Sequence, residues 1–255
     1  MGGTALVTGA ARGIGLATTK LFLAEGRRVA MIDNDLDELA RAVEGLDGAT
    51  AFPCNVSDPA QVTALVGQVA AEAGAIGALV NNAGLADFGP IEGTDFARWR
   101  AVMATNLDGV FLMSQAFVPA LKETRGAIVN IASISALRAS TLRVAYGTSK
   151  AGVAHLTQQQ AVELGEHGIR VNCVCPGPVR TKLAMAVHTQ EIIDAYHDAI
   201  PLNRYGRETE IAEAIIWLCS DKASFVTGQR LAVDGGFEAT GIGLPALRGA
   251  AGPGA

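Results

Sequence analysis

The feature that most constrains the fold of this chain is a regular alternation of short apolar runs with longer segments of helical periodicity. Such alternation predicts repeated β-α units, in which parallel strands form one sheet covered by helices on both faces. We therefore expect an α/β, doubly wound fold with a seven-stranded parallel sheet. The strand candidates are Thr4 to Thr8, Arg28 to Ile32, Ala49 to Cys54, Ala78 to Asn82, Gly126 to Ala132, Ile169 to Cys175 and Arg230 to Asp234.

The pattern shows no break that would divide the 255 residues, so a single domain over residues 1–255 is expected. Between Pro176 and Arg207 the alternation stops. Ligands of parallel sheets bind beyond the carboxyl ends of the strands, so residues 180–207 are expected to form a substrate lid. A pair of surface helices packed on the core is the alternative. Residues 239–255, rich in Gly, Ala and Pro, are expected to be a loose tail or an oligomer contact.

Charge and composition argue against several classes of partner. The net charge is −5 and Lys and Arg form no cluster, which disfavours nucleic acid. No apolar run approaches the roughly 18 residues of a membrane span, and the first strand begins too early to leave room for a signal peptide. A cytoplasmic protein is expected. No metal site is expected either, and the four cysteines are interpreted as buried free thiols: Cys54, Cys173, Cys175 and Cys219.

A glycine-rich turn, TGAARGIG from Thr8 to Gly15, follows the first strand and opens a helix. The free amides and the dipole of a helix N-terminus favour a diphosphate, and glycine allows both the tight turn and a close approach. A plain tight turn is the alternative. The segment predicts a dinucleotide site at Gly9, Arg12, Gly13, Ile14 and Gly15.

Asp33, at the end of the second strand, bears on the choice of cofactor. A carboxylate there can accept hydrogen bonds from the adenosine ribose and would repel a 2′-phosphate, which predicts NAD over NADP. Arg12 argues the other way, because a guanidinium could bind a 2′-phosphate. We give Asp33 the greater weight, since an arginine can turn to solvent. A helix cap is the alternative role for Asp33.

Tyr146 and Lys150 lie four residues apart in a helical stretch, so their side chains share one face. An ammonium beside a phenol lowers the pKa of the phenol and makes it a usable general base. Ser133 ends the fifth strand, where its hydroxyl could donate to a developing alkoxide.

Taken together, these motifs resemble the short-chain dehydrogenase/reductase family over nearly the whole chain. The matching segments are TGAARGIG, NNAG (Asn81 to Gly84), Ser133 with Tyr146-Gly147-Thr148-Ser149-Lys150, PGPVRT (Pro176 to Thr181) and Asn106 in ATNLDGVF. The resemblance implies a Rossmann-type fold and hydride transfer between a nicotinamide cofactor and an alcohol or ketone.

The resemblance also implies a role for each matched residue. Tyr146 would exchange the proton, Ser133 would orient the substrate oxygen, and Lys150 would hold the nicotinamide ribose. Asn106 would support a water relay. The family more often has Asp where Asn55 stands, at the adenine contact; Asn keeps an acceptor and adds a donor. Further cofactor contacts are implied at Asn55, Val56, Asn82, Ala83, Gly84, Pro176, Gly177, Val179 and Thr181.

The leading hypothesis is an NAD-dependent dehydrogenase that oxidises a secondary alcohol such as a polyol, sugar or cyclic alcohol. The rival is a biosynthetic ketone reductase, such as a 3-oxoacyl-(acyl carrier protein) reductase; a basic patch at Arg138 and Arg143 would favour it, because the carrier is acidic. A non-catalytic dinucleotide sensor is the third reading. The resemblance implies a homotetramer or homodimer.

The substrate is expected to meet residues outside the motifs, after the fourth and fifth strands and in the lid. His188 and His197, both in the lid, could touch substrate, but solvent exposure is the outcome that we expect. The candidates are Ala86 to Phe88, Ser135 to Arg143, Leu183, Met185, His188, Tyr196 and Tyr205.

Overall fold

The computed structural model describes residues 2–181, 185 and 188–241. Leu183 and residues 242–255 of the expected tail lie outside the described residues. The strands are β1 (Thr4–Thr8), β2 (Val29–Asp33), β3 (Ala49–Pro53), β4 (Ile76–Asn81), β5 (Ala127–Ile131), β6 (Arg170–Pro176) and β7 (Arg230–Val233).

The helices alternate with the strands, as the sequence pattern predicted. The α-helices are α1 (Gly13–Ala24), α2 (Leu36–Val43), α3 (Pro59–Glu72), α4 (Phe96–Met103), α5 (Gly109–Thr124), α6 (Val144–Leu164), α8 (Gln190–Ala199) and α9 (Glu208–Cys219). Short helical turns are Ile91–Gly93, Ile134–Ala136, Gly165–His167 and Asp221–Ala223, and a π-helical turn, Ala104–Asp108, joins α4 to α5.

All seven strands are parallel, in the order β3-β2-β1-β4-β5-β6-β7. The predicted seven-stranded, Rossmann-type sheet is therefore confirmed. The chain reverses its direction across the sheet between β1 and β4, and ligands of such sheets bind in the crevice at that switch point.

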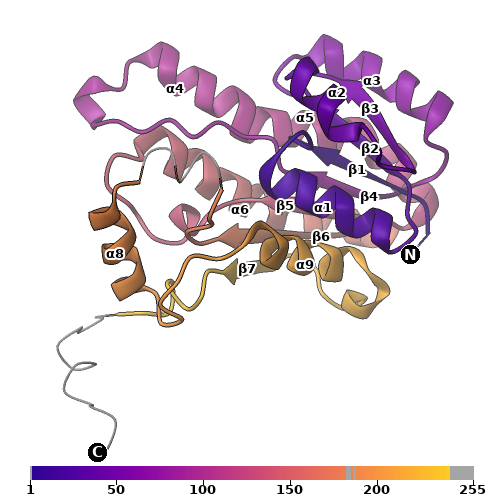
Figure 1. The fold of residues 1–255 in the computed structure, drawn as a ribbon. Helices are drawn as coiled ribbons and strands as arrows, with labels where there is room; N and C mark the ends of the chain where they lie inside the picture. The colour runs from indigo at the N-terminus through magenta and orange to yellow at the C-terminus, as the bar shows by residue number, and fades with distance from the viewer. Residues whose placement is uncertain (1, 182–184, 186–187, 242–255) are drawn as a thin grey trace, which may run out of the picture.

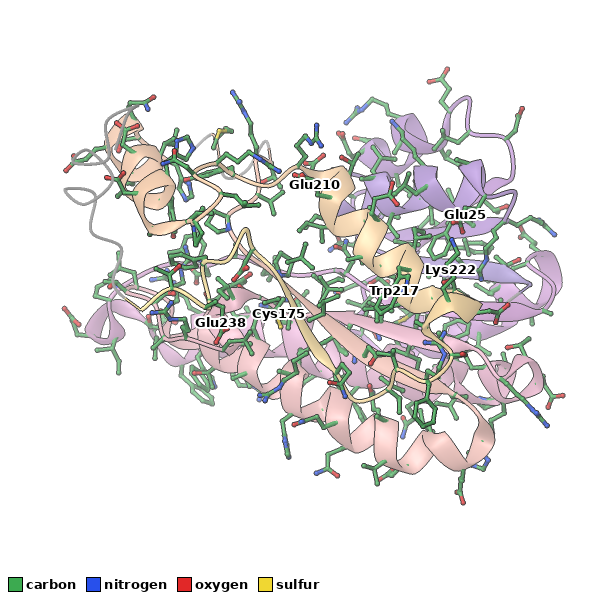
Figure 2. The ribbon with its side chains drawn as sticks, turned by 90° about the horizontal axis from the view of Figure 1, so that it is seen from below. Glu25, Cys175, Glu210, Trp217, Lys222 and Glu238 are labelled. Atoms are coloured by element: carbon green, nitrogen blue, oxygen red, sulfur yellow. The ribbon has the colours of Figure 1, made fainter. Side chains whose placement is uncertain are left out.

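The sheet is covered on both faces, as Figure 1 shows. Side chains alternate along each strand, so Ala5 and Val7 of β1 join the core beneath α1 and α9, whereas Leu6 joins the core beneath α3 and α5. Figure 2 shows α9 from below, with Glu210 near its start and Trp217 in its last turns. Both cores are built largely from fully buried aliphatic side chains, which hold the strand ends in place.

A buried polar network connects β4 and β5 to the helices beneath them. Asn81 Nδ2 donates to Asn130 Oδ1 at 2.8 Å, and Asn130 Nδ2 donates to Thr157 Oγ1 at 2.9 Å and to Gln160 Oε1 at 3.0 Å. Buried amides are stabilising only when they are hydrogen-bonded, and these bonds fix α6 against the sheet. The catalytic candidates Tyr146 and Lys150 lie on this helix.

The continuous helical stretch Phe96–Thr124 is long enough to cross a membrane and contains an 18-residue window with a mean hydropathy of 1.3. By this measure the expectation that no segment reaches the length of a membrane span is wrong. The stretch also packs as a core helix does, because Met113, Phe117 and Leu121 are buried against the sheet. One such helix is weak evidence for a span, since core helices meet the same criterion.

Candidate active site

The turn between β1 and α1 keeps its backbone open to an anion. Gly9 and Gly13 have φ values of +62° and +58°, which favour glycine. A Cβ on Gly15 would lie 2.1 Å from Gly9 O, and one on Gly9 would lie 2.9 Å from Ala83 Cα. In this described segment no side chain caps the N-terminus of α1 and no acidic residue lies in its first turn. The turn therefore fits the diphosphate of a dinucleotide.

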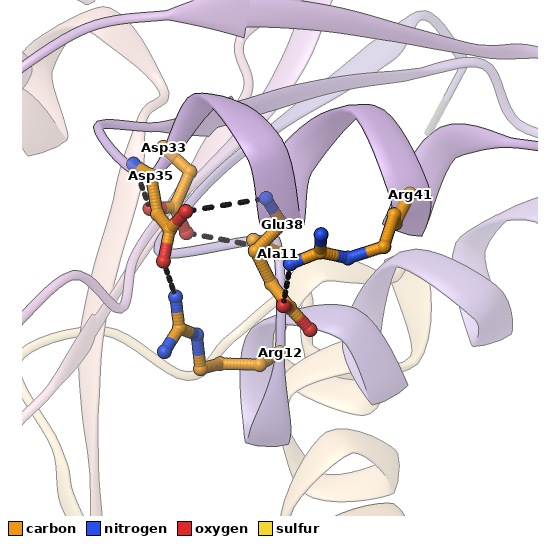
Figure 3. Close-up of polar contacts among 6 residues, drawn as sticks. All are labelled: Ala11, Arg12, Asp33, Asp35, Glu38 and Arg41. Atoms are coloured by element: carbon orange, nitrogen blue, oxygen red, sulfur yellow. Dashed lines mark hydrogen bonds and ion pairs between the residues drawn. The ribbon is translucent and has the colours of Figure 1, made fainter.

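Asp33 is held at the end of β2 by two backbone amides (Figure 3). Its Oδ2 accepts from Ala11 N at 3.0 Å, and its Oδ1 accepts from Asp35 N at 3.1 Å. The N-cap of α2 is Asp35, which accepts from Glu38 N at 3.2 Å. Asp33 is therefore not the cap of this helix, and its carboxylate is fixed beside the glycine-rich turn.

Arg12 forms an ion pair with Asp35, and both side chains are substantially exposed (Figure 3). The hydrogen bond from the Glu38 amide lowers the pKa of Asp35 most, and the hydrogen bond from the Arg12 guanidinium lowers it further. Asp33 is thus held against the glycine-rich turn, and Asp35 engages Arg12, the arginine expected to favour a 2′-phosphate.

The residues after β4 are tied to the first turn. Asn82 Nδ2 donates to Thr8 O at 2.9 Å and to Gly9 O at 3.0 Å, while Thr8 Oγ1 accepts from the amides of Asn82 and Ala83. Asn55, which follows β3, accepts from N and Oγ of Ser57 through its Oδ1. The Asn82 and Thr8 contacts join the ends of β1 and β4, whereas the contacts of Asn55 are local to the turn after β3.

Asn106 lies in the π-helical turn and its side chain is fully buried. Its Oδ1 accepts from Leu85 N at 2.7 Å, and its Nδ2 donates to Leu85 O at 2.9 Å and to Ser149 Oγ at 3.1 Å. π-helical turns are frequent at functional sites. Here the Asn106 side chain positions the chain just after Gly84, where a Cβ would lie 3.1 Å from Asn106 Oδ1 and 3.5 Å from Lys150 Nζ.

Ser133, Tyr146 and Lys150 meet at the carboxyl end of β5. Lys150 Nζ donates to Ile131 O at 2.7 Å, and it lies 5.9 Å from the centroid of the Tyr146 ring. Ser133 Oγ accepts from Ser135 N at 3.1 Å, and the Ser133 side chain is close enough to Tyr146 to lower the pKa of its phenol. The structure thus brings the predicted catalytic residues together.

Burial dominates the ionisation of this group. It raises the pKa of Tyr146, and the Ser133 hydrogen bond and the Arg143 charge act in the opposite direction. Burial also lowers the pKa of Lys150 to about 8. We expected Lys150 to lower the pKa of Tyr146, but without a bound cofactor Lys150 is not among the groups that shift this pKa. The lysine is desolvated and donates to a main-chain carbonyl.

A cavity of about 270 Å³ opens over these residues and combines the expected nicotinamide and substrate regions. It is lined from the motif segments by Ile14, Asn82, Gly84, Ser133, Tyr146, Lys150, Pro176, Gly177, Val179 and Thr181. Gly177 packs closely at the end of β6, because a Cβ there would lie 2.6 Å from Asp234 Cβ. A pocket of apolar walls with a few convergent polar groups is what a small-molecule site requires.

The other wall of the cavity comes from the substrate candidates. Leu85, Ala86, Phe88, Ser135, Ser140, Arg143, His188, Tyr196 and Phe237 contribute to it. Phe88 contacts Tyr146 edge to face, with ring centroids 5.9 Å apart. Phe237 was not predicted, although its place three residues after Asp234, at the end of β7, was a usable signal.

His188 and His197 differ from the expectation of solvent exposure, since both are half-buried. His188 Nδ1 lies 2.9 Å from Tyr205 OH, and the His188 ring stacks on Tyr196 with centroids 5.6 Å apart. Desolvation lowers the pKa of His188, and the Arg143 charge adds to this effect. Neighbouring rings hold the two histidines because α8, which periodicity did not reveal, brings Tyr196 and His197 against Tyr205.

The four cysteines are buried and free, as expected. Cys173 and Cys175 point to one face of β6 with their Sγ atoms 3.9 Å apart. Within the described residues, no group of three or more His, Cys, Asp or Glu side chains is arranged to hold a metal ion.

Comparison with known proteins places this architecture in a family. A family model described as enoyl-(acyl carrier protein) reductase matches residues 9–238. The chain is 41% identical over 241 residues to D-threitol dehydrogenase of Mycolicibacterium smegmatis, covering 92% of this chain and 93% of that protein. It is 39% identical over 243 residues to 2-(S)-hydroxypropyl-CoM dehydrogenase 3 of Xanthobacter autotrophicus, covering 91% and 95%.

A third relative, the 3-oxoacyl-(acyl carrier protein) reductase of Thermotoga maritima, is 39% identical over 241 residues, covering 92% of this chain and 98% of that protein. These relatives are oxidoreductases of alcohol or ketone groups and match nearly the full length of the chain. The chain therefore belongs to the short-chain dehydrogenase/reductase family, whose members use a nicotinamide dinucleotide.

Proposed function

We propose that this protein is an NAD-dependent dehydrogenase that oxidises a secondary alcohol, with Tyr146 as the proton acceptor. The observation that carries the proposal is the convergence of Ser133, Tyr146 and Lys150 on one cavity. This cavity adjoins a glycine turn beside which Asp33 is fixed. The class of polyols, sugars and cyclic alcohols fits a cavity wall that mixes apolar rings with hydroxyl groups, and a polyol dehydrogenase is among the relatives.

Each of the three converging side chains has a separate role in the proposed oxidation. Ser133 donates to the substrate oxygen, Tyr146 accepts the hydroxyl proton, and Lys150 binds the ribose next to the reacting ring. Tyr146 would take the carbinol proton, and a nicotinamide held by Lys150 and the glycine-rich turn would have to receive the hydride for a ketone to form. When bound, the oxidised cofactor supplies the hydride acceptor and a positive charge that favours the phenolate.

The preference for NAD rests on the carboxylates around the ribose region. Asp33 is hydrogen-bonded to Ala11 N and is not used as a helix cap, so it is free to accept from ribose hydroxyls. Arg12 is engaged by Asp35. Both features disfavour a 2′-phosphate.

The test is the initial rate of NADH formation with a panel of polyols, sugars, cyclic alcohols and 3-hydroxyacyl esters, with NADP in parallel. Tyr146→Phe should lower turnover by about 10²- to 10⁴-fold, the range of general acid-base catalysis, while NADH binding measured by fluorescence persists. If NADH binds and no substrate turns over, the non-catalytic sensor becomes the better reading.

The rival reductase is supported by the Thermotoga relative, but the basic patch that would dock an acidic carrier finds little support in the contacts. Arg138 Nη1 donates to the carbonyls of Phe237 and Thr240 at 2.8 Å each, and Arg143 lies inside the cavity wall. Reduction of acetoacetyl-CoA by NADPH, faster than any alcohol oxidation, would favour the reductase.

We also propose a homotetramer or homodimer. Large apolar side chains are exposed on two faces, Phe111 and Val162 on α5 and α6, and Trp217 and Phe225 beside α9 and β7. Contacts between subunits would remove these side chains from water, which favours association. A sedimentation mass equal to one 26.2 kDa chain would contradict the proposal.

A further inference from the structure

Arg143 occupies an unusual place for a charged side chain. It lines the catalytic cavity, with its Cζ 4.2 Å from the centroid of the Phe88 ring and 5.8 Å from that of Tyr146. Its Nη2 lies 3.5 Å from Tyr196 OH. The guanidinium is thus supported by aromatic faces, which hold a cation without using up all its hydrogen-bond donors.

The charge around Arg143 is unbalanced. Among the described residues that line the cavity, none is Asp or Glu. Lys150, which shares the cavity, is buried and donates to a main-chain carbonyl. By contrast, Arg98 and Arg204, which lie elsewhere in the chain, pair with Asp87 and Glu210. A guanidinium in a partly desolvated cavity without a carboxylate partner attracts an anion from solution.

The backbone that carries Arg143 is also specialised. Leu142 has a φ of +62°, a left-handed value that is costly for a side chain of this size. The conformation is maintained because Gly89 N donates to Leu142 O at 2.9 Å and Gly147 N donates to Arg143 O. The chain therefore turns sharply before α6, so that Arg143 lies within one helical turn of Tyr146.

We propose that Arg143 binds an anionic group of the substrate, so that the preferred substrate is a small secondary alcohol that carries a carboxylate, sulfonate or phosphate a few bonds from the carbinol. This inference rests on the proposed dehydrogenase function and names the substrate class for that site. The anion would contact the Arg143 guanidinium and Tyr196 OH. The carbinol would contact Ser133 and Tyr146 in the same cavity.

The kinetic test compares matched pairs that differ in charge, namely 3-hydroxybutyrate with its methyl ester and 4-hydroxycyclohexanecarboxylate with its amide. Hydroxypropanesulfonate and glycerol 3-phosphate distinguish the kinds of anion. The wild-type protein should prefer the anion of each pair. Arg143→Gln should lower kcat/KM for the anions by roughly 10- to 100-fold, mainly through KM, because a charged hydrogen bond is lost.

The ratio of anion to neutral kcat/KM is the decisive quantity. Arg143 also lowers the pKa of Tyr146, so its removal affects proton transfer with both members of a pair, whereas loss of the anion contact lowers kcat/KM for the anion alone and so lowers the ratio. Arg143→Lys should restore part of the ratio. Arg100→Gln, an exposed arginine on α4, serves as the control and should leave the ratio unchanged.

A binding measurement separates this proposal from the proposed function. In Tyr146→Phe protein loaded with NADH, calorimetry should show tighter binding of acetoacetate than of methyl acetoacetate, and Arg143→Gln added to that background should abolish the difference. An equal affinity for the two ketones, or a kinetic ratio that Arg143→Gln leaves unchanged, overturns the anion site. If the wild-type protein oxidises none of the alcohols but the binding preference for acetoacetate is present, the proposed dehydrogenase function is overturned and the anion site is not.

Discussion

Cofactor choice can be reversed, we predict, by two substitutions at the end of β2. Asp33→Ser removes the carboxylate that would accept from the ribose, and Asp35→Asn frees Arg12 while keeping an oxygen that can accept from Glu38 N at the cap. Two unit charges 4 Å apart interact by about 1 kcal/mol in bulk water and about 4 kcal/mol at an effective dielectric constant of 20.

Because Asp33 is half-buried, we expect its repulsion of a 2′-phosphate to lie between these two energies. Removing its repulsion of a 2′-phosphate should therefore improve NADP relative to NAD by roughly 10- to 1,000-fold, at about 1.4 kcal/mol for each factor of ten. The freed Arg12 should add a smaller gain, because exposed ion pairs contribute about 0.2–1 kcal/mol.

The assay is kcat/KM for NAD and NADP with one alcohol, for the wild type, each single variant and the double variant. Asp37→Asn is the matched control: it removes an equal charge from the exposed first turn of α2 and should change the NADP/NAD ratio by little. Thermal melts check that loss of the Ala11 and Asp35 hydrogen bonds to Asp33 has not unfolded the turn. An unchanged ratio in folded Asp33→Ser protein would refute the role given to this carboxylate.

Three further outcomes are expected. Burial lowers the pKa of Lys150 from 10.5 to about 8, so between these values the unfolded chain holds more protons and the free energy of unfolding rises with pH, by about 3 kcal/mol in total. Lys150→Met should remove that rise, which urea titrations of both proteins at pH 7.5 and pH 10.5 would measure. Gly15→Ala should abolish NADH binding because its Cβ would lie 2.1 Å from Gly9 O, whereas Gly67→Ala, which meets no atom within 4 Å in α3, should bind NADH normally and raise stability by about 0.5–1 kcal/mol. Asn130→Leu should destabilise the fold by about 2–5 kcal/mol, since it leaves Gln160 Oε1 and one Asn81 N–H without their buried partner; a loss below 1 kcal/mol in a chemical melt would show that the network relaxes.

Local patterns were sufficient to predict the sheet and the chemistry at its edge. The apolar runs located all seven strands to within about two residues, because a buried parallel strand is apolar on both faces. Tyr146 and Lys150 were predicted to share a face because helical spacing alone requires it. Asp33 could be placed near the glycine turn because both follow neighbouring parallel strands, and the structure adds the hydrogen bond to Ala11.

Contacts between distant segments could not be predicted in this way. Nothing local to Arg12 indicates that it pairs with Asp35 rather than with solvent, since the pair depends on how two βα turns lie side by side. The π-helical turn around Asn106 has no signature in apolar periodicity. His188 was expected in solvent, yet Tyr196 and Tyr205, brought by α8 and the turn after it, contact its ring.

The ionisation of Tyr146 shows why the composition of a site is not enough to predict its reactivity. A Tyr-x-x-x-Lys pair predicts a lowered phenol pKa if the ammonium is charged and close, but here burial acts on both groups and favours their neutral forms. Arg143 is the charged side chain that lowers the pKa of Tyr146 in the protein itself. Arg143→Gln should therefore shift the ascending limb of the pH profile of kcat, on which Tyr146 loses its proton, to higher pH for neutral alcohols. Since a guanidinium acting only through substrate binding would leave that limb in place, the pH profile separates the effect of Arg143 on the proton acceptor from its effect on the substrate.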